Sequence, residues 1–160
     1  MRQGDQAGRE LSAETCAAIG GLPLPLDWGR VRVYGSACGR RAGLVRNAVL
    51  RLSHGRAIAL GNHVFLPARC EGDLAMLAHE VTHCAQYQAW GPWRYFTRAA
   101  AAQLRDLAHR LWGLGRSPYA YAPGRTYQSY GIEQQAQIVE DALRGSAAAR
   151  AITGASARAT

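Results

Sequence analysis

The chain has 160 residues, of which 48% are hydrophobic, so it is long enough to fold as one domain with its own core. It holds no run near the roughly 18 consecutive apolar residues of a membrane helix, which argues against a membrane protein. Its formal charge of +8 comes entirely from arginine. The densest basic stretch, residues 39–56, has no interleaved aromatic residues, which favours a solubilising surface and makes a nucleic-acid partner an unfavoured alternative.

Residues 1–10 are polar and mixed in charge, and we expect them to form a flexible lead-in. They lack the apolar segment of a secretory signal, so we expect synthesis and folding in the cytoplasm, compatible with export by a signal-independent secretion system. None of the four cysteines belongs to a Cys-x-x-Cys pair, and we expect free thiols.

Sequence patterns predict one helix and then several strands in the first half of the chain. Ser12 is a suitable N-cap for a helix over residues 13–19. Gly61 and Asn62 favour a tight turn between two strands. Apolar and β-branched side chains predict strands over residues 28–34, 45–53, 57–60 and 63–66.

The second half is predicted to be helical. Asp73 is a suitable N-cap for a helix to residue 88, and Gly91 with Pro92 breaks it. Further helices are predicted over residues 93–112 and 131–143, and a disordered tail over residues 146–160. We therefore predict an α+β domain over residues 11–145, with a small, mainly antiparallel sheet followed by three main helices.

Two histidines stand one helical turn apart in the sequence His79-Glu-Val-Thr-His83. Side chains four residues apart project from the same helix face, so both imidazoles could bind one tetrahedral Zn²⁺ ion at about 2.0–2.1 Å. Glu80 lies about 100° further round the helix, beside the metal, where it could act as a general base. The alternative is a helix without a metal site, in which two histidines stand four residues apart by chance and the glutamate is solvated.

A catalytic zinc site usually needs a third protein ligand. A histidine just downstream is excluded, because Gln86 and Ala89 occupy the positions of the longer His-Glu-x-x-His-x-x-Gly-x-x-His motif. We expect Glu133, at the edge of the apolar stripe of the last helix, to be the third ligand, with Glu140 the next candidate. Gln137 could hydrogen-bond a ligand imidazole from the same helix.

The other histidines, His54, His63 and His109, are expected to be ordinary residues and not ligands. Cys84 follows His83 but turns away from it, and we expect it to be a small core residue.

Residues 57–67 (Ala-Ile-Ala-Leu-Gly-Asn-His-Val-Phe-Leu-Pro) and 77–86 (Leu-Ala-His-Glu-Val-Thr-His-Cys-Ala-Gln) resemble a bacterial family of proposed zinc metallopeptidase domains. These domains occur beside contractile injection systems, including type VI secretion systems, and beside polymorphic toxins; short members are labelled Vgr-related proteins. The similarity extends over residues 11–143. The family is similar to the gluzincins, which implies a minimal zincin-like fold and a glutamate on a later helix as third ligand, here Glu133.

The resemblance also implies roles for residues around the metal. Gluzincins often carry an acidic residue four positions after the ligand glutamate, but this chain has Gln137 there, which would polarise a ligand imidazole less. The strand before the metal helix, around Asn62 and residues 63–66, would bind extended peptide by β-augmentation. Independently of the resemblance, a zinc-dependent peptidase needs a hydrogen-bond donor for the oxyanion, and Tyr87, Tyr121, Tyr127 and Tyr130 are candidates; the alternative is that these tyrosines only pack.

We therefore expect a zinc-dependent metallopeptidase that hydrolyses a peptide or protein substrate, with an effector, toxin or other secretion-system protein as the implied substrate or partner. The alternative is a catalytically weak or inactive zinc-binding adaptor of an effector complex. No membrane partner is expected.

Overall fold

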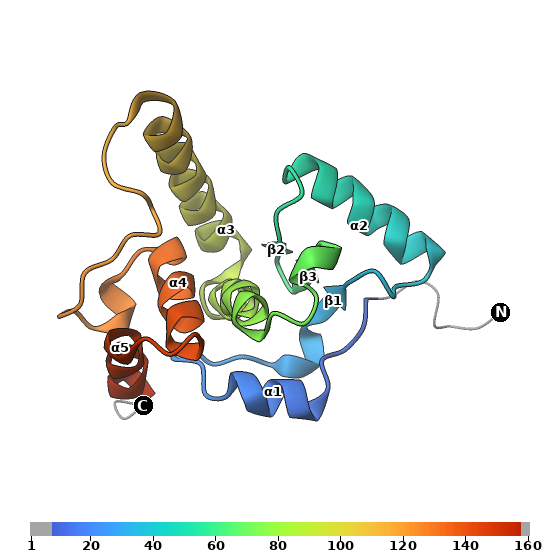
Figure 1. Cartoon of the computed structure of the whole chain (residues 1–160), viewed down its shortest axis with the longest axis horizontal. Coiled ribbons are helices and arrows are strands. Elements are labelled where there is room, and N and C mark those ends of the chain that lie inside the picture. The colour runs from blue at the N-terminus through green and yellow to red at the C-terminus, as the bar shows by residue number, and fades with distance from the viewer. Residues whose placement is uncertain (1–7, 158–160) are drawn as a thin grey trace.

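The computed structural model of the chain describes residues 8–157, which form a small three-stranded sheet followed mainly by helices (Figure 1). This confirms the predicted α+β class. In chain order the helices and strands are α1 (Ala13–Ile19), β1 (Arg32–Tyr34), α2 (Arg40–Leu52), β2 (Ile58–Leu60), β3 (His63–Phe65), α3 (Leu74–Trp112), α4 (Ile132–Leu143) and α5 (Ala147–Ala157). Short 3₁₀ turns occupy Trp28–Arg30, Ala68–Cys70 and Tyr127–Ser129.

The sheet has the strand order β1-β3-β2, with β1 parallel and β2 antiparallel to β3. The predicted turn at Gly61 and Asn62 is confirmed, and Gly61 adopts a positive φ of 64°, as the first central residue of a type II′ turn does. The predicted strand over residues 28–34 is shorter, because a 3₁₀ turn precedes Arg32.

The lead-in needs a correction. Residues 1–7 lie outside the described part of the chain, but the backbone of Arg9 exchanges two 2.8 Å hydrogen bonds with Val33 of β1. Arg9 is therefore fastened to the edge of the sheet by an isolated β-bridge, so this part of the lead-in is not a free arm.

The predicted strand over residues 45–53 is wrong, because this segment belongs to helix α2. Its inward side chains are Ala42, Arg46, Val49 and Leu50, which follow the helical spacing i, i+4, i+7 and i+8. Arg46 is held inside by its Nε, which donates to the Leu66 carbonyl at 2.8 Å. Apolar and β-branched side chains suggested a strand here, but in the helix Val45 is 52% exposed.

Helix α3 carries the metal motif and bends where the sequence predicted a break. Asp73 caps its first turn, accepting from the Met76 amide at 3.0 Å. Gly91 interrupts the helical backbone at φ 76° and ψ 165°, and Pro92 follows it. The two parts of α3 therefore run in different directions (Figure 1).

Helix α4 packs along the first part of α3, and α5 packs on α4. The predicted disordered tail is wrong for residues 147–157, which form α5, while residues 158–160 lie outside the described part. Alanine favours helix, and Ala149 and Ile152, three residues apart, are both buried in the core. The core also contains the fully buried Val31, Val64 and Ile138. No helix within residues 8–157 is both long and apolar enough to cross a bilayer.

Candidate metal centre

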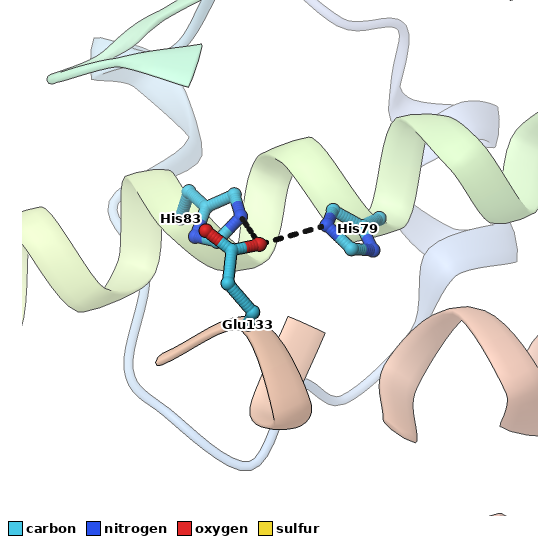
Figure 2. Close-up of side chains that lie close together, drawn as sticks. All are labelled: His79, His83 and Glu133. Carbon is cyan, nitrogen blue, oxygen red and sulfur yellow. Dashed lines mark ion pairs between the residues drawn. The ribbon is translucent and has the colours of Figure 1, made fainter. Parts of the chain in front are cut away.

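Three buried side chains from two helices converge at one point (Figure 2). His79 and His83 come from the first part of α3, and Glu133 comes from the first turn of α4. Glu133 Oε2 lies 3.8 Å from His79 Nε2 and 3.5 Å from His83 Nε2. One ligand atom from each residue falls within 4.8 Å of the others, and each residue is at most 7% exposed.

Helices α3 and α4 pack against each other, and Ala136 on α4 is fully buried. Ala136 lies three residues after Glu133, so it shares the inward face of α4 with the carboxylate. The structure thus brings together the three residues that the sequence suggested as ligands.

Hydrogen bonds at the outer nitrogens orient both imidazoles. His79 Nδ1 lies 3.0 Å from Glu140 Oε2, and His83 Nδ1 lies 2.8 Å from Gln86 Oε1. Both partner atoms are acceptors, so Nδ1 is a donor in each ring, and Nε2, which faces Glu133, is the nitrogen that offers its lone pair once its proton is displaced. This tautomer is the one that a metal requires, and the three donors therefore fit a divalent ion.

The orientation of Gln86 is itself fixed. Its Nε2 donates to the Ile132 carbonyl and to Gln135 Oε1, both at 3.0 Å, so its oxygen must face His83. Gln86 is fully buried and joins the metal helix to the start of α4.

Glu140 is an outer partner of His79 and belongs to a chain of charges. Its Oε1 accepts from Arg144 Nε at 3.0 Å, and Arg144 Nη2 donates to Asp73 at 2.8 Å. Gln137, expected near an imidazole, instead donates to Asp141 Oδ1 at 2.9 Å. The acidic partner missing at position 137 is therefore supplied one helical turn later, by Glu140.

The pKa values in this cluster follow from burial and close contacts. Burial would lower the pKa of His79, but its contacts with Glu133 and Glu140 raise it to about 9. Burial would raise the pKa of Glu133, yet its contacts with the two imidazoles hold it well below its usual range. Protons and a metal cation would compete for these nitrogens.

Glu80 lies beside the two histidines on α3 and is 5% exposed. Burial raises the pKa of its carboxyl group, and the two histidines oppose that rise. A carboxylate with a raised pKa accepts a proton more readily at neutral pH than a solvated one.

The four tyrosines named as oxyanion candidates are engaged elsewhere. The hydroxyl groups of Tyr121, Tyr127 and Tyr130 donate to Asp141, to the Gln135 carbonyl and to the Ala122 carbonyl, respectively. Tyr87 packs edge-on against Tyr95 and Phe96. The structure therefore does not bring these residues to the metal cluster in an oxyanion-binding role.

Tyr119 is the tyrosine that lies next to the metal cluster. Its ring centroid is 6.3 Å from that of His79, and its hydroxyl oxygen accepts from Arg56 Nη2 at 2.7 Å. Arg56 is held in turn by Asp106, at 3.8 Å. Tyr119 lies in the segment between α3 and α4, near the predicted candidates Tyr121, Tyr127 and Tyr130, but only the fold reveals that Arg56, before β2, meets it.

The β-augmentation role expected for residues 62–66 is wrong for β3, because that strand already has neighbours on both sides. The outer strand on the α3 side is β2, where the Ala59 carbonyl accepts from Tyr95 at 3.5 Å. Asn62 Oδ1 accepts from Gln88 at 2.8 Å, so this side chain fastens the hairpin to α3.

The remaining histidines lie outside the cluster, which within residues 8–157 is the sole group of this kind. The four cysteines are unpaired, and Cys84 is fully buried in the core, as expected.

Comparison with known proteins gives one finding. Residues 27–91 match the family model of the eCIS core domain, where eCIS denotes an extracellular contractile injection system. The matched segment runs from before β1 to the bend in α3; it contains His79, Glu80 and His83 but ends before Glu133. No curated protein and no solved structure matches the chain. The match links this segment to contractile injection systems.

Proposed function

We propose that the protein is a zinc-dependent peptidase of a contractile injection system. The observation that carries this proposal is the cluster of two imidazoles and a carboxylate, with both Nδ1 atoms already hydrogen-bonded and Glu80 beside them. His79, His83 and Glu133 would hold the ion. Bound zinc would supply Lewis-acid polarisation of a peptide carbonyl and a water molecule of lowered pKa.

Side chains of the protein itself transfer the protons and stabilise the developing negative charge. Glu80 accepts the proton of the attacking water and delivers it to the departing amine. Tyr119 is free to donate its phenolic proton, because its oxygen accepts from Arg56. Donors placed where negative charge develops lower the barrier, so Tyr119 and Arg56 stabilise the oxyanion.

The test compares wild type with Glu80→Gln, which keeps the side-chain shape but removes the base. Both proteins, purified without added zinc, should contain about one zinc per chain by elemental mass spectrometry. Cleavage of casein or of a mixed peptide library should fall about 10²–10⁴-fold in Glu80→Gln. Absence of metal, or equal cleavage by both proteins, would overturn the proposal.

A second candidate function is that of a zinc-stabilised adaptor in an effector complex. It is favoured by Leu104, Leu107 and Leu111 on the second part of α3, which are 68%, 49% and 61% exposed. Their spacing of three and four residues puts them on one helix face, a feature typical of protein-binding helices. Stoichiometric zinc with no cleavage of any library peptide would favour the adaptor.

A further inference from the structure

A cavity of about 750 Å³ adjoins the candidate metal centre. The second part of α3, residues 116–131 and the start of α4 form its walls, and Glu133 is one of its lining residues. Its size lies within the range of about 300–1,000 Å³ found for ligand sites. Of the three cluster residues, Glu133 is the one that a molecule in this cavity would meet.

Four arginines line this cavity: Arg98, Arg105, Arg116 and Arg125. All four are exposed, and none forms an ion pair within residues 8–157. The only acidic lining residue, Glu133, is engaged by the two imidazoles. Arginines near other acidic groups are paired, as Arg56 is with Asp106 and Arg144 with Glu140.

Arg98 lies over the Trp90 ring at 4.5 Å and keeps its charge, so four guanidinium groups without an acidic partner surround the cavity and favour an anionic occupant. Nucleic acid is disfavoured by the aromatic lining, because single strands need open faces on which bases can stack. Tyr121 and Tyr130 instead pack edge-on against each other at 6.0 Å, and both hydroxyl groups are hydrogen-bonded internally. Much of the remaining wall is alanine and serine, which leaves room for an extended chain.

We infer that this cavity binds an acidic peptide segment, whose Asp and Glu side chains pair with the four arginines. The inference rests on the proposed peptidase function and specifies its substrate class. Arginine forks match carboxylates in geometry as well as in charge, so several pairs would fix the position of the peptide beside Glu133.

Binding can be measured without cleavage in the zinc-loaded Glu80→Gln protein. The probe is a fluorescein-labelled dodecapeptide of alternating glutamate and alanine, followed by fluorescence anisotropy. The same peptide with glutamine in place of glutamate, and oligothymidylate of equal length, are the comparison ligands. We expect the glutamate peptide to bind at least about tenfold more tightly than either, and its affinity to fall as salt is raised.

Arg105→Gln combined with Arg116→Gln should weaken binding of the glutamate peptide about tenfold. The matched control, Arg30→Gln with Arg51→Gln, removes the same charge from exposed positions outside the cavity and should change affinity less than about twofold. Equal losses in both double variants, no preference over the glutamine peptide, or tighter binding of oligothymidylate would overturn the inference.

A cleavage assay separates this inference from the proposed function. If wild type cleaves the glutamine and glutamate peptides equally well, the substrate class is wrong and the peptidase proposal stands. If neither is cleaved but the arginine-dependent anisotropy signal persists, the acidic-peptide site stands and the peptidase proposal fails.

Discussion

Gln86 decides how His83 presents its lone pair, although it is not expected to touch a metal. Its amide is held by Ile132 and Gln135 and offers its oxygen to His83 Nδ1. Gln86→Ala should therefore weaken zinc binding about 10–100-fold, as measured by competition with a chromogenic chelator.

Gln137→Ala is the matched control for this change. Its side chain bonds Asp141 and not an imidazole, so its zinc affinity should remain close to that of wild type. A larger loss of affinity in Gln137→Ala than in Gln86→Ala would contradict the assignment of these two amides.

Tyr119 provides a second test at the residue scale. Tyr119→Phe removes the proton donor but keeps the ring beside His79. We expect kcat to fall about 10²–10³-fold, with KM and zinc content nearly unchanged. Tyr34→Phe, which removes a hydroxyl 3.3 Å from His63 Nδ1 outside the cluster and the cavity, should leave kcat close to the wild-type value; an equal loss in both variants would point to a general structural effect.

Asp73 makes the stability of the folded domain depend on pH in the acid range. The bond from the Met76 amide, followed by the contact with Arg144, lowers its pKa below the ordinary 3.8. A lowered pKa in the folded state means that the carboxylate stabilises the protein above 3.8 and that this contribution disappears as pH falls through the folded-state value.

Asp73→Asn keeps a capping oxygen but has no titrating group. Its free energy of unfolding in urea should be lower than that of wild type at neutral pH, and the difference should shrink progressively as pH falls below 3.8. A difference that stayed constant with pH would show that charge at this position is unimportant.

At the scale of elements, the bend of α3 depends on Gly91. Its φ of 76° with ψ of 165° lies in a region open almost only to glycine. Gly91→Ala should therefore lower the free energy of unfolding by about 1–3 kcal/mol.

Gly154 provides a control for which the free energy of unfolding should change in the opposite direction. It lies within helix α5, and a methyl group there would meet no atom within 4 Å. Gly154→Ala should raise the free energy of unfolding by about 0.5–1 kcal/mol. Two changes of the same sign would contradict the assigned backbone conformations.

The elements that the sequence predicted well are those with strong local signals. The β2–β3 turn has Gly61, α3 has its N-cap Asp73, and the bend has Gly91 with Pro92. The segment 45–53 was ambiguous because its β-branched valines favour a strand although their spacing of four residues fits one helix face, and the inward position at 46 is filled by an arginine. Helix α5 looked like a disordered tail because its composition hides two buried positions, Ala149 and Ile152.

The sequence predicted only those features of the site that follow from the spacing of residues within a single helix. Spacing alone puts His79 and His83 on one face, and the apolar stripe of α4 suggests Glu133. The meeting of Arg56 with Tyr119, and of Glu140 with His79, joins segments far apart in the chain. No local periodicity encodes such contacts, so they became visible only in the fold.

At the scale of the whole molecule, a metal would connect α3 to α4. A ligand that binds only the folded state stabilises it, by about 2.7 kcal/mol at a free concentration of 100 times its Kd. Removing zinc with a chelator should therefore lower the melting temperature by several degrees in differential scanning calorimetry, and added zinc should restore it.

His83→Ala should melt at a temperature that the chelator no longer changes, because the cluster loses one donor. Persistent chelator sensitivity in that variant would place the stabilising metal somewhere else in the protein.

The donors of the cluster come from residues 79–83 and 133, so a nascent chain that has emerged only as far as the bend at Gly91 carries both imidazoles but no carboxylate. The four arginines that line the cavity, all of which follow Gly91 in the chain, have not been synthesised at that stage either. Hydrolytic capacity would then appear only when synthesis of the domain is nearly complete, which would protect the ribosome-bound chain and its neighbours from premature cutting.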